Sequence, residues 1–163
     1  MIIRLKNKDT LIVEDFKLKC CIGKKGLKKL KIEGDSTTPI GTFTLGNLYF
    51  RDDRNRIPQT KLKKKIIKKN MIWCDDPKNK NYNKEIIKTK NMQSEKLFRK
   101  DNKYDYLIII NYNRQNIIPY KGSAIFIHLT DNYDKTKGCI ALKKKDFLIL
   151  AKLINKKTKI KIS

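Results

Sequence analysis

Histidine is almost absent from this chain of 163 residues, and cysteine is scarce. The single histidine is His128, and the four cysteines are Cys20, Cys21, Cys74 and Cys139. No cysteine pair has the CxxC spacing common in zinc sites, and one imidazole adds little to a ligand set, so we expect no metal site. Neighbouring residues of a strand point to opposite faces. Cys20 and Cys21 are therefore not expected to pair, and one of them should face the core.

Acidic residues are also few, with 16 Asp and Glu against 40 Lys and Arg, which gives a formal net charge of +24. Such a charge attracts phosphates, so affinity for nucleic acid or another anionic polymer is one interpretation. Only six of the basic residues are arginine, however, whereas guanine readout and base stacking depend on arginine and on clustered aromatic side chains. A solvated lysine surface explains the composition better, and we expect no specific nucleic-acid partner.

Long apolar stretches are missing, because no window approaches the length of a membrane-spanning helix. The N-terminus, MIIRLKNKDTLIVEDF, enters short alternating strands directly and shows no signal peptide. We therefore expect a soluble protein without a membrane span. The length is that of one domain, and the apolar runs LIII and SAIFI supply a core despite the charge, so residues 1–163 are expected to form a single domain.

Short β-branched and aromatic segments, broken by turn residues, predict a β-sheet in the N-terminal third. Residues 51–101 form a polar, lysine-rich excursion, which we expect to carry short helices, KLKKKIIKKN being a weak candidate, and to supply a wall of a site. The continuous apolar runs within 104–113 and 122–129 predict central strands. Helical spacing within 143–155 predicts a C-terminal helix, and alternation in 157–163 predicts a final strand.

The stretch FIHLTDNYDKTKGCIAL places His128 at the end of a predicted core strand and Cys139 eleven residues later, directly behind Gly138. An imidazole that takes the thiol proton leaves a thiolate, the activated nucleophile of acyl-transfer enzymes. Gly138 would let a substrate carbonyl approach the backbone, and the N–H groups of Lys137, Gly138 and Cys139 would form an oxyanion hole. The alternative is an ordinary core pair, since free cysteine is commonly buried and a strand-end histidine is often simply hydrogen-bonded.

These residues occur in motifs that resemble the YkuD-type L,D-transpeptidase catalytic domain. The family signature is a histidine at a strand end, a loop, and a Ser/Thr-His-Gly-Cys turn followed by an apolar residue, which His128 and TKGCIAL match. TPIGTF, at 38–43, and GSAIFIH match two further landmarks. WCDDP, LFRKD, and the YN and YD pairs at Tyr82 and Tyr104 resemble a compact proteobacterial branch. The similarity spans nearly the whole chain.

Two positions depart from the common family pattern. Lys137 stands where most members have a second histidine, so only its backbone N–H would act in the site. Ala141 stands where many members have an arginine two residues after the cysteine, which removes the usual contact with a substrate carboxylate. Arg99, within LFRKD, is the candidate replacement, and its alternative role is an ion pair with a surface acid.

The resemblance implies an α+β fold that is mainly β: a YkuD-like β-sandwich with a few short helices, a C-terminal helix and a final strand. It also implies cysteine-dependent acyl transfer on peptidoglycan stem peptides, in which Cys139 attacks a carbonyl and His128 shuttles the proton, without a cofactor. One alternative is an L,D-carboxypeptidase or another hydrolase with the same site, and another is a non-catalytic basic module that binds nucleic acid or anionic wall polymer. We expect a monomer in the periplasm, although no signal peptide is visible.

Four further candidate residues each have two interpretations. Trp73 and Tyr112 would wall the peptide groove or else pack in the core, as aromatic residues more often do. Asp75 and Asp76 would bind a substrate amine or else initiate a loop before the following proline.

The turn before the cysteine supplies one more candidate. Thr136 would orient His128 or else cap the turn. For the proposed chemistry, the Cys139 sulfur and the His128 imidazole should meet within hydrogen-bonding reach at the floor of an open groove.

Overall fold

The computed structural model describes residues 1–89 and 94–163, and this part of the chain is mainly β with one helix. The first strands are β1 (Ile2–Lys6), β2 (Thr10–Val13), β3 (Phe16–Cys21), β4 (Leu27–Lys28), β5 (Thr38–Pro39), β6 (Gly41–Phe50), β7 (Lys64–Ile66) and β8 (Met71–Cys74). They are followed by β9 (Glu85–Ile87), β10 (Ser94–Lys96), β11 (Tyr106–Ile110), β12 (Phe126–Leu129), β13 (Ile140–Leu142), α1 (Lys144–Leu153) and β14 (Lys159–Ile162). The predicted α+β class, mainly β, is confirmed, whereas the sandwich stays a prediction.

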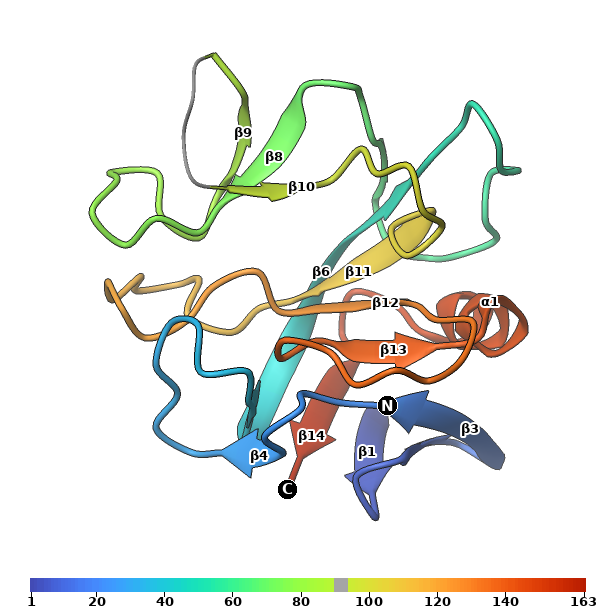
Figure 1. Cartoon of the computed structure of the whole chain (residues 1–163). Coiled ribbons are helices and arrows are strands. Elements are labelled where there is room, and N and C mark those ends of the chain that lie inside the picture. The colour runs from blue at the N-terminus through green and yellow to red at the C-terminus, as the bar shows by residue number, and fades with distance from the viewer. Residues whose placement is uncertain (90–93) are drawn as a thin grey trace.

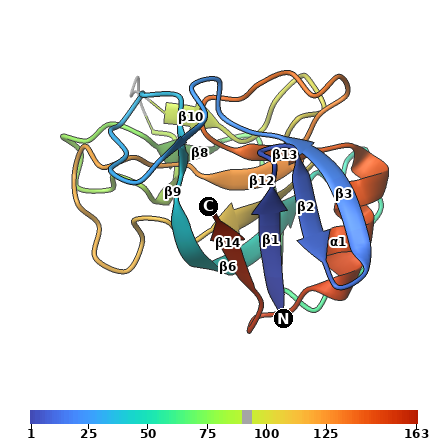
Figure 2. The same ribbon diagram turned by 90° about the horizontal axis from the view of Figure 1, so that it is seen from below.

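The main sheet has a barrel-like arrangement (Figure 1). Its strand order is β11-β12-β13-β3-β2-β1-β14-β6-β7, and β11 pairs with β6 as well as with β12. A sheet that returns to its first strand pairs most of its backbone N–H and C=O groups. The predicted N-terminal strands lie in this sheet, where Ile3 of β1 pairs in parallel with Ile160 of β14 (Figure 2).

Strands β11 and β12 are buried on both faces, as their continuous apolar sequences predict. Alternate residues of β11 enter different cores. Ile108 belongs to the larger apolar cluster of the barrel, while Leu107 and Ile109 belong to a smaller cluster on the opposite face. Phe126 and Cys139 are also members of the smaller cluster. This face of the barrel therefore supports a second layer.

Three strands of the excursion at 51–101, β8, β9 and β10, form that second layer. Its three-stranded antiparallel sheet, in the order β10-β8-β9, lies above the barrel in Figure 1. The prediction of short helices is wrong for the described part of the excursion, and KLKKKIIKKN instead contributes β7, which pairs in parallel with β6. Helix propensity is a weak preference, and pairing with a long strand overrides it here.

The predicted C-terminal helix and final strand are confirmed. α1 buries Phe147, Leu150 and Ala151, whose spacing places them on one helical face against the larger core. β14 alternates exposed lysines with buried isoleucines, the pattern of a strand with one covered face. Among residues 1–89 and 94–163, no helix combines the length and the apolar character that crossing a membrane requires.

Candidate active site

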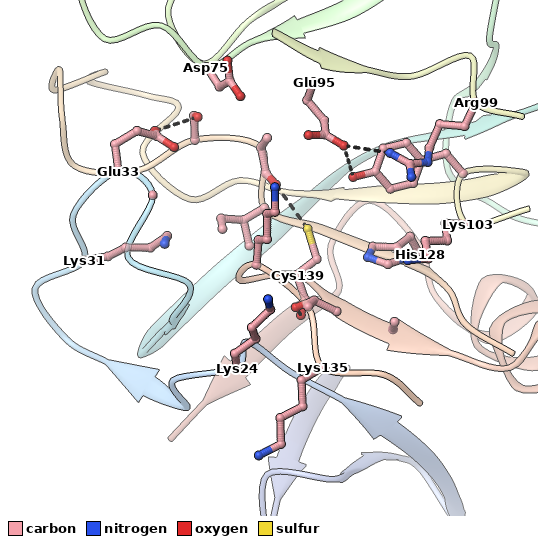
Figure 3. Close-up of a pocket in the computed structure, with 18 of the residues that line it drawn as sticks. Lys24, Lys31, Glu33, Asp75, Glu95, Arg99, Lys103, His128, Lys135 and Cys139 are labelled. Atoms are coloured by element: carbon pink, nitrogen blue, oxygen red, sulfur yellow. Dashed lines mark hydrogen bonds and ion pairs between the residues drawn. The ribbon is translucent and has the colours of Figure 1, made fainter. Parts of the chain in front are cut away.

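A cleft of about 1040 Å³ lies between the barrel and the excursion, and both halves of the chain line it (Figure 3). The barrel contributes His128 and Cys139, and the loop after β4 contributes Lys31 and Glu33. The excursion contributes Asp75, Asp76, Glu95 and Arg99. The prediction that this excursion supplies a wall of the site is confirmed.

The register of two parallel strands brings His128 and Cys139 to the same face of the barrel. His128 of β12 pairs with Ala141 of β13, and Cys139 lies two residues before Ala141, on the same side of the sheet. Diagonal neighbours of this kind have Cα atoms about 7–8 Å apart. Both side chains line the cleft, as Figure 3 shows.

The turn at Gly138 is shaped by the TPIGTF landmark. A Cβ atom at Gly138 would lie 2.7 Å from the carbonyl oxygen of Thr37, and the Gly138 φ angle is +142°. The Thr38 hydroxyl donates to the Gly138 carbonyl at 2.8 Å and accepts from the Gly23 N–H at 2.9 Å. The sequence motif thus positions the backbone directly before Cys139.

Substitution of Gly138 by alanine is expected to destabilise this turn. The left-handed backbone costs an alanine about 1 kcal/mol and the clash with Thr37 about 2 kcal/mol more. Gly26→Ala is the matched control, because Gly26 also has a positive φ, +77°, but has nothing within 4 Å of the added Cβ. Thermal unfolding of both variants measures the difference, and equal losses would contradict the steric role of Thr37.

Thr136 caps the turn rather than orienting His128. Its hydroxyl donates to the Cys139 carbonyl at 2.6 Å and accepts from the Gly138 N–H at 3.0 Å. The Gly138 N–H is therefore already engaged and is not a free oxyanion donor. The backbone N–H groups of Lys137 and Cys139 are the remaining candidates from the three that the sequence suggests.

His128 is held as a neutral base. Its Nδ1 lies 2.8 Å from the Leu129 carbonyl oxygen, which can only accept, so Nδ1 carries the proton and Nε2 keeps its lone pair. Burial lowers the imidazole pKa from 6.5 to about 4, and the positive charges of Lys103 and Arg99 act in the same direction. At neutral pH the ring is therefore uncharged, and the Nε2 lone pair is free.

Cys139 is held as a neutral thiol. Its Sγ donates to the Ala124 carbonyl at 3.2 Å and accepts from the Phe126 N–H at 3.4 Å. Burial raises the thiol pKa to about 12, with the Phe126 N–H opposing this shift and Glu95 adding to it. Contrary to expectation, the thiol and the His128 imidazole form no hydrogen bond with each other, because the thiol bonds to the backbone of the segment leading into β12.

The other three cysteines lie outside this cleft. Cys20 belongs to the larger core, which confirms that one of the adjacent pair faces the core, and the Cys21 thiol donates to the Asp134 carbonyl at 3.1 Å. Cys74 is fully buried in β8. All four cysteines are unpaired, and the described residues contain no cluster of three or more His, Cys, Asp or Glu side chains suited to a metal ion.

Four acidic residues line the cleft, Glu33, Asp75, Asp76 and Glu95, and Figure 3 shows Asp75 and Glu95 across the cleft from Cys139. Burial, together with the charges of Glu33 and Glu95, raises the pKa of Asp75 to about 6. The Asp75 Oδ1 atom is buried without a hydrogen-bond partner. Asp76 lines the same cleft and also accepts from the Lys78 N–H at 3.0 Å, so its loop-forming role is present as well.

Two of the cations that line the cleft, Arg99 and Lys31, are already paired with acidic side chains. Arg99 binds Asp101 with two bonds of 2.8 and 2.6 Å and reaches Glu95 at 3.4 Å, so the ion-pair alternative is present at a residue that still lines the cleft. Lys31, only 3% exposed, binds Asp35 at 2.6 Å, and its charge lowers the Cys139 pKa. Sequence reasoning missed Lys31 because nothing distinguishes one lysine among so many.

The prediction that Trp73 and Tyr112 wall the groove is wrong, since neither lines the cleft. Trp73 is 1% exposed, packs edge-on against Phe126 and donates its indole N–H to Asn83 Oδ1 at 2.9 Å. Tyr112 packs edge-on against Phe43, and its hydroxyl donates to the Lys121 carbonyl at 2.6 Å. Each aromatic ring has packing and polar partners that hold it away from the substrate side.

The fold resembles two solved structures. They are crystal structures of the helical cell shape determining protein Pgp2 from Campylobacter jejuni and of a point mutant of it, with TM-scores of 0.50 and 0.52 and 19% identity in each case. The match covers 99% of this chain and 46% of theirs, so the chain spans about half the length of these structures. A search of curated proteins gave no significant match.

The family assignment comes from the whole length of the chain. The model of the YkuD family, described as the L,D-transpeptidase catalytic domain, matches residues 2–162. This match includes the strand that carries His128, the turn before Cys139 and the excursion that completes the cleft. The chain therefore belongs to the YkuD family of L,D-transpeptidase catalytic domains.

Proposed function

We propose that this chain is one catalytic domain that carries out cysteine-dependent acyl transfer on peptidoglycan stem peptides, as an L,D-transpeptidase. The observation that carries the proposal is the placement of Cys139 and His128 on one face of the barrel within an open cleft of about 1040 Å³. Membership of the YkuD family supports peptidoglycan as the substrate. Because peptidoglycan lies outside the cytoplasmic membrane, the proposed place of action is the periplasm.

The proposed reaction begins with a rearrangement of the thiol. The Cys139 S–H leaves the Ala124 carbonyl and turns toward Nε2 of His128, which takes its proton as the sulfur attacks the carbonyl of the L-centre of a diamino acid. The amide C–N bond breaks, the leaving amine receives the proton from the imidazolium, and a thioester remains. The neutral resting pair avoids burying two charges before a substrate arrives.

The second half of the reaction restores the thiol. An amine from another stem attacks the thioester and gives up a proton, the C–S bond breaks, and His128 returns a proton to the sulfur. The backbone N–H groups of Lys137 and Cys139 are the proposed donors to the oxyanion formed in both halves. Water in place of the amine would give a trimmed stem, the outcome of an L,D-carboxypeptidase.

The proposed substrate orientation follows from the charge pattern of the cleft. A stem peptide with a diamino acid carries both an ammonium and a carboxylate, and the cleft has walls of both signs. Asp75 and Asp76 are the proposed partners of the ammonium group. The Arg99 side chain is 30% exposed despite its ion pairs, and it is the proposed partner of the carboxylate.

Substitution of Asp75 by asparagine is expected to raise KM by about tenfold at pH 8 for a stem peptide with a free amine. The pKa of Asp75 is about 6, so the carboxyl group is mostly ionised above pH 6 and mostly protonated below it. The wild-type KM should therefore rise as the pH falls through 6. The variant should lose this part of the pH dependence. Asp52→Asn, the same charge change at an exposed position, is the control. Identical KM profiles for both variants would contradict a role of Asp75 in binding.

Incubation with purified stem peptides, followed by mass analysis of the products, tests the proposed function. A cross-linked dimer supports the transpeptidase, and a shortened monomer supports the carboxypeptidase. Unchanged peptides with fully folded protein would overturn both. Salt-sensitive binding of an anionic polymer that persists in Cys139→Ala would then favour the basic binding module.

A further inference from the structure

Arg99 is the one residue of the LFRKD motif with a part in the proposed substrate binding, yet the structure holds the whole motif and the tyrosine that follows it firmly in place. Leu97 is 1% exposed in the smaller core. From the loop after β6, Arg51 Nη1 donates to the Arg99 carbonyl at 2.7 Å and Arg54 Nη1 donates to the Lys100 carbonyl at 3.1 Å. Two arginine side chains therefore hold the backbone of this segment against the barrel.

Tyr104, three residues after the LFRKD motif, lines the cleft. It is 7% exposed, and its hydroxyl donates to Glu95 Oε1 at 2.9 Å. The guanidinium carbon of Arg99 lies 5.1 Å from the centre of the tyrosine ring, and Arg99 is itself held by both carboxylate oxygens of Asp101. The tyrosine is thus fixed at its hydroxyl and along its ring.

The ring of Tyr104 packs against the proposed base. The centroids of Tyr104 and His128 are 5.2 Å apart, with the ring planes at 73°, a T-shaped contact, and Phe126 contacts the same tyrosine at 5.8 Å and 83°. Among the residues that the structure describes, His128 has one hydrogen bond, from Nδ1 to the Leu129 carbonyl. A single bond fixes one nitrogen but leaves the tilt of the imidazole to its neighbours.

We propose that Tyr104 is a positioning residue for His128. The tyrosine sets the tilt of the imidazole so that Nε2 can take the proton of Cys139. Glu95 and Arg99 hold the tyrosine in place. Besides facing the substrate, these charged residues therefore influence the position of His128 through the tyrosine ring. The role in catalysis rests on the proposed function, whereas the restraint on the imidazole can be measured without any substrate.

Substitution of Tyr104 by leucine tests the restraint in two ways. kcat/KM on the stem peptide should fall about 10- to 100-fold, because small misplacements of a reacting group carry losses of that size. The imidazole should also gain water, so its pKa should rise from about 4 toward 6.5 in an NMR titration. His128 is the only histidine, so the titration has one signal. The charges near it, Lys103, Arg99 and Asp101, are unchanged by the substitution.

Tyr106→Leu is the matched control, because Tyr106 is 3% exposed, hydrogen-bonded and stacked on Phe147 in the other core. It should lose stability without altering the His128 titration. Tyr104→Phe, which keeps the ring, should lose about threefold or less in kcat/KM. If Tyr104→Leu does not fold, Tyr104→Met replaces it.

The outcomes separate this inference from the proposed function. A His128 titration in Tyr104→Leu that matches Tyr106→Leu would overturn the positioning role, whatever the activity. A shifted titration in a protein that never turns over stem peptides would retain the restraint on His128 and reject the proposed function.

Discussion

Replacing Cys139 by alanine is expected to lower kcat by about 10⁴-fold or more, since loss of a nucleophile removes the covalent route completely. Without the sulfur, no thioester can form, although the cleft and its charged walls remain. Stem-peptide turnover is the measurement, with circular dichroism to verify the fold. Alanine fills the 8% exposed cysteine site with little change in packing, so the variant should unfold near the wild-type temperature.

Cys74→Ala is the control for this variant. Cys74 is equally a buried, unpaired thiol, but it lies in β8 outside the cleft lining. Its replacement should leave turnover within about twofold, because surrounding packing is only slightly changed. Similar losses in both variants would indicate a structural effect of cysteine removal and would contradict nucleophilic catalysis at residue 139.

Replacing His128 by glutamine is expected to lower kcat/KM by about 10²- to 10⁴-fold, the usual contribution of a general base. A glutamine side chain can still donate to the Leu129 carbonyl, but its amide cannot take the thiol proton at neutral pH. The thiol pKa is about 12 in the resting structure, so thiolate is scarce without a base. The variant should therefore regain activity as pH rises.

Rates of turnover and of Cys139 acylation between pH 6 and pH 10 measure this effect. Asp131→Asn serves as a control at an exposed acid in the loop between the two residues. A His128→Gln variant with wild-type rates across the whole range would show that another group accepts the proton.

Sequence alone predicted that the two central residues of the candidate site lie together, because each sits in a recognisable local pattern. The apolar run in GSAIFIH leads into β12, whose four residues are all buried and include His128 next to the strand's end. TKGCIAL places a glycine before the cysteine, and the structure gives Gly138 the backbone angle and the close contact that require it. Parallel pairing of β12 with β13 then places both side chains on one face.

The excursion was harder to predict because its partners are distant in the sequence. Trp73 resembles a groove residue in a polar segment, but a buried amide from Asn83 and the edge of Phe126 hold it in the core. The lysine-rich stretch resembles a helix, but β6 offers it a strand edge. These outcomes depend on tertiary contacts that neither periodicity nor propensity records.

The hydrogen bond that the Cys139 thiol makes also could not be predicted from the sequence. The pairing of the two strands places Cys139 near His128, but it does not determine which acceptor the S–H group bonds to. The structure gives it the Ala124 carbonyl, at 3.2 Å, while burial keeps the imidazole and the thiol both neutral at neutral pH.

The most direct test of the central claim is the intact mass of the protein after incubation with a carbapenem, which acts as an acyl donor. One adduct per chain is expected, mapped by peptide analysis to Cys139 and missing from Cys139→Ala. An unmodified wild-type protein, or an adduct on Cys20, Cys21 or Cys74, would contradict the claim.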